Sequence, residues 1–215
     1  MTNTPSIPAF LEDVFHDGFT FTNPDGTRYE FYCQPIGDLP VRDGRIIACD
    51  PFIFMNDEPF TAQFPTGNFP LELAIARLQD DERIGFARIR FSAAAPVRWA
   101  FALTASQNPA TLEEGYYFGY PVDAGTGSFM DQSAAATFAA FFDRDEKNFE
   151  RLIDWMQATY KNTRSWYLFK EGPATVAMFS SGWGDGLYPS LIGYDAGGGI
   201  CRLVTDFLLL AWPDA

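Results

Sequence analysis

Two glycine-rich segments place aspartates beside glycines, a composition that can serve catalysis, ligand binding or a tight turn. The first contains Asp123, Gly125 and Gly127, and the second contains Gly184 and Asp185. An aspartate next to such a loop can hold a metal ion or orient a water, and glycines let a ligand approach the backbone. Aspartate and glycine are also the commonest turn residues, because the aspartate side chain accepts hydrogen bonds from nearby amides. Taken one at a time, these residues favour the turn interpretation.

A divalent-cation site is the enzymatic alternative that these aspartates allow. Asp123, Asp131 and Asp185, with Asp50 as a further candidate, can supply oxygen ligands if the fold gathers their loops. Carboxylates without histidine suit magnesium or calcium better than zinc. The first segment does not follow the EF-hand pattern, because its third and fifth positions are glycines. This alternative predicts a metal-assisted hydrolase or a small-ligand-binding enzyme.

Other kinds of catalytic site have little support in the sequence. The single histidine, His16, lies in an irregular N-terminal region, which argues against a nucleophilic triad. The chain has no GxSxG elbow, no GxxxxGK[ST] loop and no GxGxxG motif opening a helix. Its three cysteines are widely separated and lack CxxC spacing. A binding protein without a cofactor is therefore favoured over an enzyme.

Aromatic side chains flank the second glycine-rich segment. Trp183 and Tyr188 can form a wall for a ligand or a partner, since aromatics beside small loop residues are common in binding hot spots. The candidate binding residues are Asp123, Gly125, Gly127, Asp131, Trp183, Gly184, Asp185 and Tyr188.

The charge of the chain points to a basic partner. Fifteen basic residues against 28 acidic ones give a formal net charge of −13. Such a field repels phosphate backbones and anionic lipid headgroups, so neither nucleic acid nor a membrane surface is expected as a partner. It attracts a basic protein and raises the rate of association.

The expected location is the cytoplasm. The three cysteines are typical of buried thiols in a reducing compartment. The N-terminus has no basic region followed by an apolar one, and the longest apolar run, residues 207–212, is too short to span a bilayer.

Hydrophobic periodicity predicts the elements that position these loops. Alternation over residues 69–75 indicates a half-buried strand, and a change of phase after residue 86 indicates a bulge near Ala87. Further strands are expected at 29–33, 44–51, 98–104, 116–122, 166–170, 175–180 and 200–210. Asp131 is expected to cap a helix over 132–142, and the apolar spacing of Phe149, Leu152, Ile153, Met156 and Tyr160 predicts a second helix from about residue 145.

The order of these elements predicts an α+β fold. Most connections are too short for parallel crossovers, so we expect a mainly antiparallel sheet or a two-layer β-sandwich, with the helical pair at about 132–160 on one side. We expect a single domain over residues 1–215, with 1–43 as an N-terminal elaboration.

Four motifs in order resemble those of a bacterial family. They are Gly44-Arg45-Ile46 with Cys49-Asp50-Pro51, Pro65-Thr66-Gly67-Asn68-Phe69-Pro70, Val122-Asp123-Ala124-Gly125-Thr126-Gly127 with Met130-Asp131, and Ser181-Gly182-Trp183-Gly184-Asp185-Gly186. Together they resemble the family called domain of unknown function 4241, over about residues 38–206. The resemblance supplies no reaction, since that family is uncharacterised.

The type of protein that this resemblance suggests adds a functional hypothesis. Small acidic bacterial proteins of this kind are often immunity partners of toxins, so we expect an immunity-type protein that neutralises a basic bacterial toxin, such as one encoded nearby.

Overall fold

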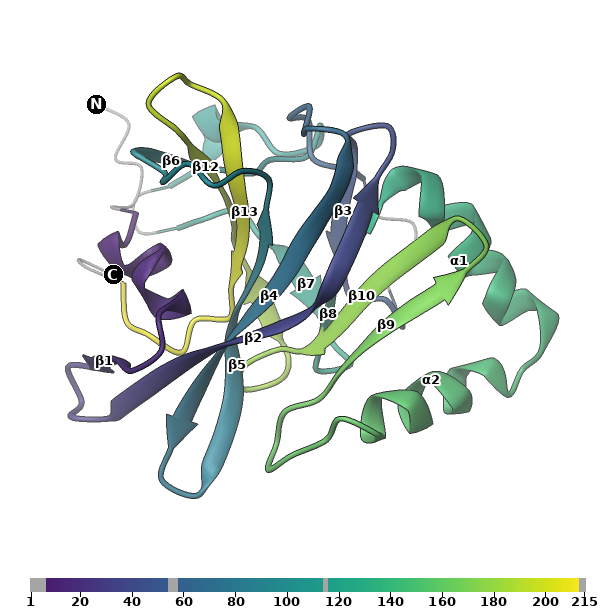
Figure 1. Cartoon of the computed structure of the whole chain (residues 1–215), viewed down its shortest axis with the longest axis horizontal. Coiled ribbons are helices and arrows are strands. Elements are labelled where there is room, and N and C mark those ends of the chain that lie inside the picture. The colour runs from purple at the N-terminus through teal and green to yellow at the C-terminus, as the bar shows by residue number, and fades with distance from the viewer. Residues whose placement is uncertain (1–6, 54–57, 114–115, 213–215) are drawn as a thin grey trace.

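The computed structural model describes residues 7–53, 58–113 and 116–212, and its largest element is an antiparallel sheet of seven strands (Figure 1). The strand order is β1-β2-β4-β5-β13-β12-β6. In chain order these strands are β1 (Phe19–Thr22), β2 (Arg28–Val41), β4 (Gly67–Leu78), β5 (Asp81–Arg90), β6 (Arg98–Phe101), β12 (Ser190–Tyr194) and β13 (Ile200–Asp206). Every pairing within the sheet is antiparallel.

A smaller antiparallel sheet has four strands in the order β3-β8-β10-β9. They are β3 (Ile46–Cys49), β8 (Thr126–Asp131), β9 (Trp166–Glu171) and β10 (Ala174–Ser180). A separate two-stranded ribbon pairs β7 (Tyr120–Val122) with β11 (Gly186–Tyr188). This ribbon joins the two glycine-rich segments of the sequence.

The two main sheets share an apolar core, and each is covered on its other face. Leu71 and Leu73 of β4 belong to the same buried cluster as Phe129 of β8 and Phe179 of β10. The outer face of the larger sheet is covered by the short helices η1 (Ala9–Leu11) and η2 (Asp13–Phe15) and by Leu209, Leu210 and Trp212. The outer face of the smaller sheet is covered by α1 (Gln132–Arg144) and α2 (Asn148–Gln157).

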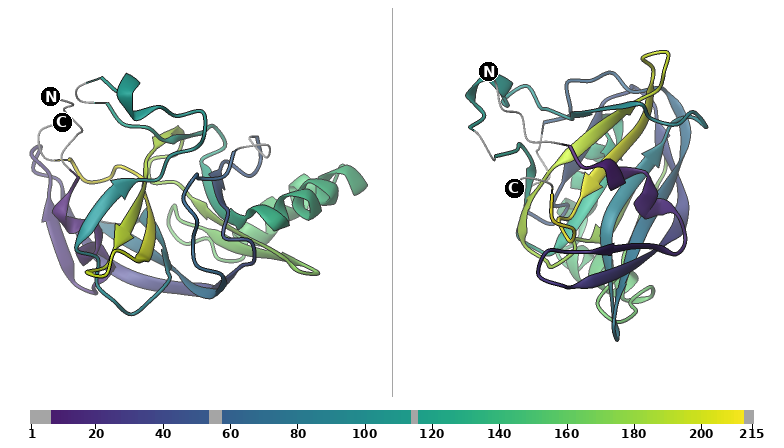
Figure 2. Two further views of the ribbon diagram at one scale, coloured as in Figure 1. Left: turned by 90° about the horizontal axis from the view of Figure 1, so that it is seen from above. Right: turned by 90° about the vertical axis from the view of Figure 1, so that its left-hand side faces the viewer.

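The predicted α+β class with mainly antiparallel sheet is therefore confirmed. Figure 2 shows the helical pair on the opposite side of the molecule from the N-terminal segment. One further short helix, η3 (Pro109–Thr111), lies in the connection between β6 and β7.

The alternation in β4 follows the layering. Leu71, Leu73 and Ile75 face the smaller sheet, because they belong to the core that the two sheets share. The predicted bulge is present, but it lies at Gly85 and not at Ala87, since the register passes from Ala74↔Phe86 to Ile75↔Ile84. A Cβ at Gly85 would lie 2.9 Å from the ring of Phe31, so close packing favours glycine there.

The helical pair departs from the prediction at α2. Asp131 caps α1 as expected, accepting a hydrogen bond from the Ser133 amide at 3.1 Å. Helix α2 is shorter than predicted, and only Leu152 and Met156 of its apolar residues are buried. The predicted apolar face is wider than the face that the sheet covers, so its remaining residues, Phe149, Ile153 and Tyr160, stay exposed.

The N-terminal region contributes directly to the larger sheet. Strand β2 begins near the predicted strand at 29–33 but continues to Val41, paired along β4. Residues 1–43 thus include the first two strands of this sheet, and their status as an elaboration stays a prediction. No helix in the described part of the chain is long and apolar enough to cross a bilayer.

A buried carboxylate anchors the segment that follows β13. The Asp206 side chain is fully buried and accepts hydrogen bonds from the Leu208 amide at 2.7 Å and the Trp212 indole at 2.8 Å. Asn23 binds the same segment through the Leu209 carbonyl and the Ala211 amide. Burial raises the pKa of Asp206 to about 7, although the two donors act in the opposite direction.

We expect the free energy of unfolding to fall between pH 4 and pH 7 because of Asp206. The folded state binds the Asp206 proton more tightly than the unfolded state, in which the pKa of an aspartate is about 3.9. The stabilisation from this protonated carboxyl group is therefore complete below pH 4 and is lost as pH rises to about 7. The upper limit of the loss is about 4 kcal/mol. Urea unfolding at pH 5, 6, 7 and 8 measures it, and Asp206→Asn should remove this slope. An unchanged slope in that variant would contradict the assignment.

Candidate functional site

The two glycine-rich segments lie against each other. The Ser181 amide donates to the Gly125 carbonyl at 3.1 Å, and a Cβ at Gly125 would lie 3.7 Å from the Cα of Gly184. The β7–β11 ribbon joins them further, because Val122 pairs with Gly186. We call residues 123–127 and 181–188 together the paired loops. Two segments about 60 residues apart in the sequence therefore form one surface feature.

Asp50 holds the first of the paired loops in place. Its carboxylate is fully buried and accepts three amide hydrogen bonds, from Phe52 at 2.9 Å, Asp123 at 2.9 Å and Ala124 at 2.7 Å. Two of these donors lie in the loop and one lies just after β3. Asp50, which the sequence offered as an additional metal ligand, thus bridges β3 to the loop that follows β7.

The second loop closes on its own backbone. Ser181 accepts the Gly184 amide with its carbonyl, and its hydroxyl donates to the Gly184 carbonyl at 2.8 Å. The Tyr188 hydroxyl donates to the same carbonyl at 2.8 Å. Burial, with a smaller contribution from nearby Asp185, raises the pKa of Tyr188 to about 12, so this phenol stays a donor at neutral pH.

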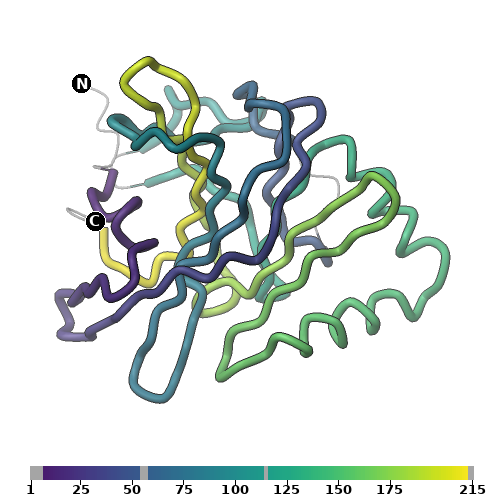
Figure 3. The backbone as a smooth tube through the Cα atoms, viewed as in Figure 1, coloured from purple at the N-terminus to yellow at the C-terminus, as the bar shows by residue number. Residues whose placement is uncertain are grey.

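Trp183 is exposed yet held in position. Its side chain is 54 % exposed, and the Arg83 guanidinium lies 4.2 Å from the ring centroid. Arg83 also donates to the Gly182 carbonyl at 3.0 Å and to the Asp81 carboxylate at 2.7 Å. It reaches Trp183 from the start of β5, beside the hairpin turn that projects beyond the larger sheet (Figure 3). A cation–π contact of this kind fixes an aromatic ring at the surface.

Asp123 and Asp185 present their carboxylates to solvent. Both residues are exposed, and within the described residues neither side chain accepts a hydrogen bond. Both lie in bends, as the turn interpretation predicts, but the hydrogen bonds that hold these loops come from other side chains: Asp50 holds the first loop, and Ser181 with Tyr188 holds the second. Their charges remain available to another molecule.

Three candidate residues, Gly127, Asp131 and Tyr188, lie inside the protein, so the prediction that Tyr188 forms an exposed aromatic wall with Trp183 is wrong. Asp131 ends β8, five residues after Thr126, and its carboxylate binds the Ser133 amide and hydroxyl and the Arg42 amide. An extended strand rises about 3.3 Å per residue, which places Asp131 about 16 Å from Thr126, at the far end of β8. Gly127 is buried in β8, and a Cβ there would lie 2.7 Å from the Tyr120 hydroxyl.

These positions do not assemble the alternative cation site. Among the described residues, no group of three or more histidine, cysteine, aspartate or glutamate side chains could hold a metal ion. Asp123 and Asp185 lie on the paired loops, whereas Asp131 caps α1 at the other end of β8.

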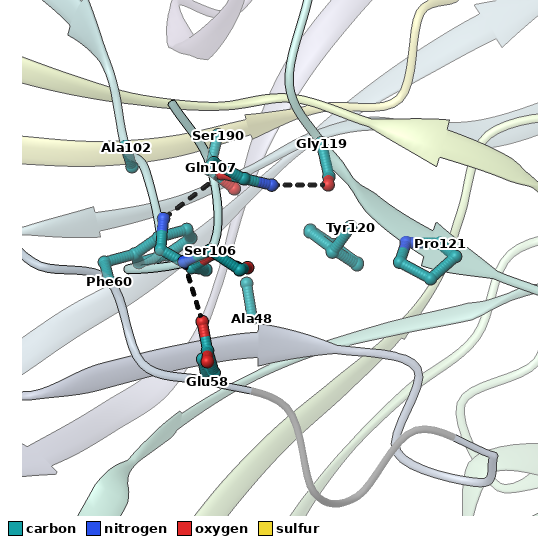
Figure 4. Close-up of a pocket in the computed structure, with 11 residues that line it drawn as sticks. Ala48, Glu58, Phe60, Ala102, Ser106, Gln107, Gly119, Tyr120, Pro121 and Ser190 are labelled. Atoms are coloured by element: carbon teal, nitrogen blue, oxygen red, sulfur yellow. Dashed lines mark hydrogen bonds between the residues drawn. The ribbon is translucent and has the colours of Figure 1, made fainter. Parts of the chain in front are cut away.

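A pocket that the sequence did not indicate lies next to the ribbon (Figure 4). Its volume is about 240 Å³, and Gly119, Tyr120 and Pro121 of the β7 region form one side. Glu58 forms another side and accepts the Ser106 amide at 3.1 Å. Several of its polar lining residues fall within residues 104–108. Nothing in the sequence of that segment indicates that it lies next to β7.

The fold and the paired loops define a class of protein: two stacked antiparallel sheets with a helical pair on one side and an aromatic, acidic loop surface. The chain belongs to the family described as "Protein of unknown function (DUF4241)", whose model matches residues 39–205. The match includes Asp50, both paired loops and the pocket. Neither a curated protein nor a solved structure matches the chain.

Proposed function

We propose that this protein binds a basic protein partner through the paired loops and acts as an immunity-type protein that neutralises a basic bacterial toxin. One observation carries the proposal: the paired loops present an exposed Trp183, held by Arg83, together with the exposed carboxylates of Asp123 and Asp185, which have no hydrogen-bond or ion-pair partner among the described residues. Aromatic anchors of this kind contribute a large share of binding energy at protein interfaces.

The rigidity of the paired loops supports a role in binding. Asp50, Ser181 and Tyr188 fix the two backbones, and Arg83 fixes the Trp183 ring. A surface that is already ordered loses less conformational entropy when it binds, so more of its contact energy appears as affinity. Leu187, 46 % exposed on β11, extends the apolar part of the same surface.

Most basic residues of the chain already pair with its own carboxylates, so few are left to neutralise the remaining acidic residues. Within the described ranges, nine of the 15 basic residues form ion pairs with carboxylates of the same chain. They are Arg77, Arg83, Arg88, Arg90, Arg144, Arg151, Lys161, Arg164 and Arg202. Asp123 and Asp185 have no such partner among the described residues. A basic protein is therefore attracted over a distance of roughly one Debye length, about 8 Å at physiological ionic strength.

Co-purification with the product of the neighbouring gene tests this function. We expect the two proteins to form a complex that weakens as salt rises, and we expect co-expression to protect cells from that product. The variant Trp183→Ala removes the aromatic anchor from the paired loops, so it should weaken the complex. A neighbouring product that neither binds nor harms unprotected cells would contradict the proposal.

A further inference from the structure

We propose that the pocket beside β7 receives one cationic side chain, a lysine or an arginine, from the bound partner. This inference rests on the proposed function, because the partner supplies the side chain. The pocket lies close to the paired loops: Pro121 lines it, and Asp123 follows two residues later. Pro121 also pairs with the exposed Leu187 across the ribbon. A partner that covers Asp123 and Leu187 therefore reaches the pocket as well.

The size of the pocket suits a single side chain. Its volume is about 240 Å³, which is below the roughly 300–1,000 Å³ of typical small-molecule sites. Apolar walls formed by Phe60, Ala102 and Pro121 can pack against a methylene stem. A long side chain with a polar end fits both features.

The polar groups of the pocket favour a cation. Among the described residues that line it, none is lysine, arginine or histidine, and Glu58 is the one carboxylate. Glu58 binds the Ser106 amide through Oε2, while Oε1 has no donor among the described residues. Oε1 can therefore accept a charge-assisted hydrogen bond from an incoming group.

Several donors around the pocket already have acceptors, and the Tyr120 hydroxyl, which has no hydrogen-bond partner among the described residues, is buried from solvent beside Gly127. The Gln107 amide group donates to the Gly119 carbonyl at 3.1 Å and accepts the Thr104 amide at 3.1 Å. The Thr104 and Ser106 hydroxyls lie 3.0 Å apart and bind each other. Figure 4 shows Glu58, Ser106 and Gln107 arranged around the same space. One hydroxyl proton of the Thr104–Ser106 pair and the second N–H of Gln107 stay available, but the charged group left for a ligand is Glu58 Oε1, which favours a cation.

Titration with blocked amino acids tests the inference. The probes are N-acetyl-arginine methylamide, the lysine equivalent, and the neutral isostere N-acetyl-citrulline methylamide, followed by amide NMR shifts. We expect saturable shifts at Ala48, Ser106 and Gln107 with the cationic probes and binding roughly tenfold weaker with citrulline, equivalent to about 1.4 kcal/mol. Equal binding of citrulline, or no saturable shifts at these residues, would overturn the inference.

Two variants localise the effect. Glu58→Gln keeps an acceptor for the Ser106 amide, so the fold should be retained while cation binding falls roughly tenfold. Glu113→Gln is the matched control, because Glu113 is exposed and does not line the pocket; it should leave binding unchanged. Similar binding by both variants would contradict the role of Glu58, and a shift of the urea midpoint in either would be corrected by measuring at lower temperature.

Two further comparisons distinguish a free small amine from a partner side chain, and the inference about the pocket from the proposed function. If agmatine or free arginine bound at least a hundredfold more tightly than the blocked amino acids, the pocket would serve a free small amine and the partner side chain would be ruled out. Loss of the complex with intact cation selectivity would contradict the proposed function alone. A complex that forms without cation selectivity would contradict the inference alone.

Discussion

Replacing Asp50 with alanine is expected to lower the free energy of unfolding by about 3 kcal/mol or more, one of the two largest effects that we expect from a single substitution. Three amide donors lose a charged acceptor at once, and one hydrogen bond to a charged group contributes about 1.5–3 kcal/mol. Two of these donors, Asp123 and Ala124, belong to the paired loops. Urea unfolding at neutral pH measures the loss.

Asp25 offers the matched control for this prediction. Its carboxylate accepts one exposed amide, that of Thr27 at 2.8 Å. Asp25→Ala should therefore cost about 1 kcal/mol or less. Equal losses for the two variants would show that Asp50 does not hold the loop in the way described. Hydrogen exchange should also accelerate at Asp123 and Ala124 in Asp50→Ala.

Gly182→Ala is expected to destabilise the protein by about 3 kcal/mol, through two additive causes. Gly182 has φ +49°, a left-handed conformation that costs other residues about 1 kcal/mol. A Cβ there would also lie 2.8 Å from the Phe207 carbonyl oxygen, and this backbone atom has little freedom to move. Overpacking of this kind adds about 1–3 kcal/mol.

Gly198→Ala separates the two causes. Gly198 has φ +81°, but nothing lies within 4 Å of its Cβ position. Only the backbone cost of about 1 kcal/mol should remain. Thermal and urea unfolding of both variants measure the difference, and a loss at Gly198 as large as that at Gly182 would rule out the contact with Phe207 as its source.

The regular elements could be predicted because their signals are local. The alternation of Leu71, Leu73 and Ile75 and the cap at Asp131 each depend on neighbours within a few residues. Three glycines within residues 182–186 indicate a sharply bent loop, and Gly182 and Gly184 do have positive φ. A helix or a turn of this type is determined largely by its own sequence.

The site depends on contacts that the sequence does not reveal. Asp50 lies 73 residues before Asp123, yet it forms the loop in which we expected Asp123 itself to accept the amides. Arg83 lies 100 residues before Trp183 and stacks on it. Both contacts depend on how the strands pack. The composition of the loops alone therefore could not distinguish Asp50, which holds the first loop in place, from Asp123 and Asp185, which are exposed on the paired loops.

The most direct test of the account compares two double variants that remove the same charge. Asp123→Asn/Asp185→Asn changes the paired loops, and Asp13→Asn/Asp154→Asn changes two exposed acids elsewhere. The measurement is the affinity for the neighbouring gene product at low and moderate salt, together with the urea midpoint. We predict at least tenfold weaker binding and a smaller salt dependence for the first variant, with an unchanged midpoint, and affinity within about twofold of the original for the second. Equal affinities for the two double variants would contradict the proposal that the paired loops form the binding surface.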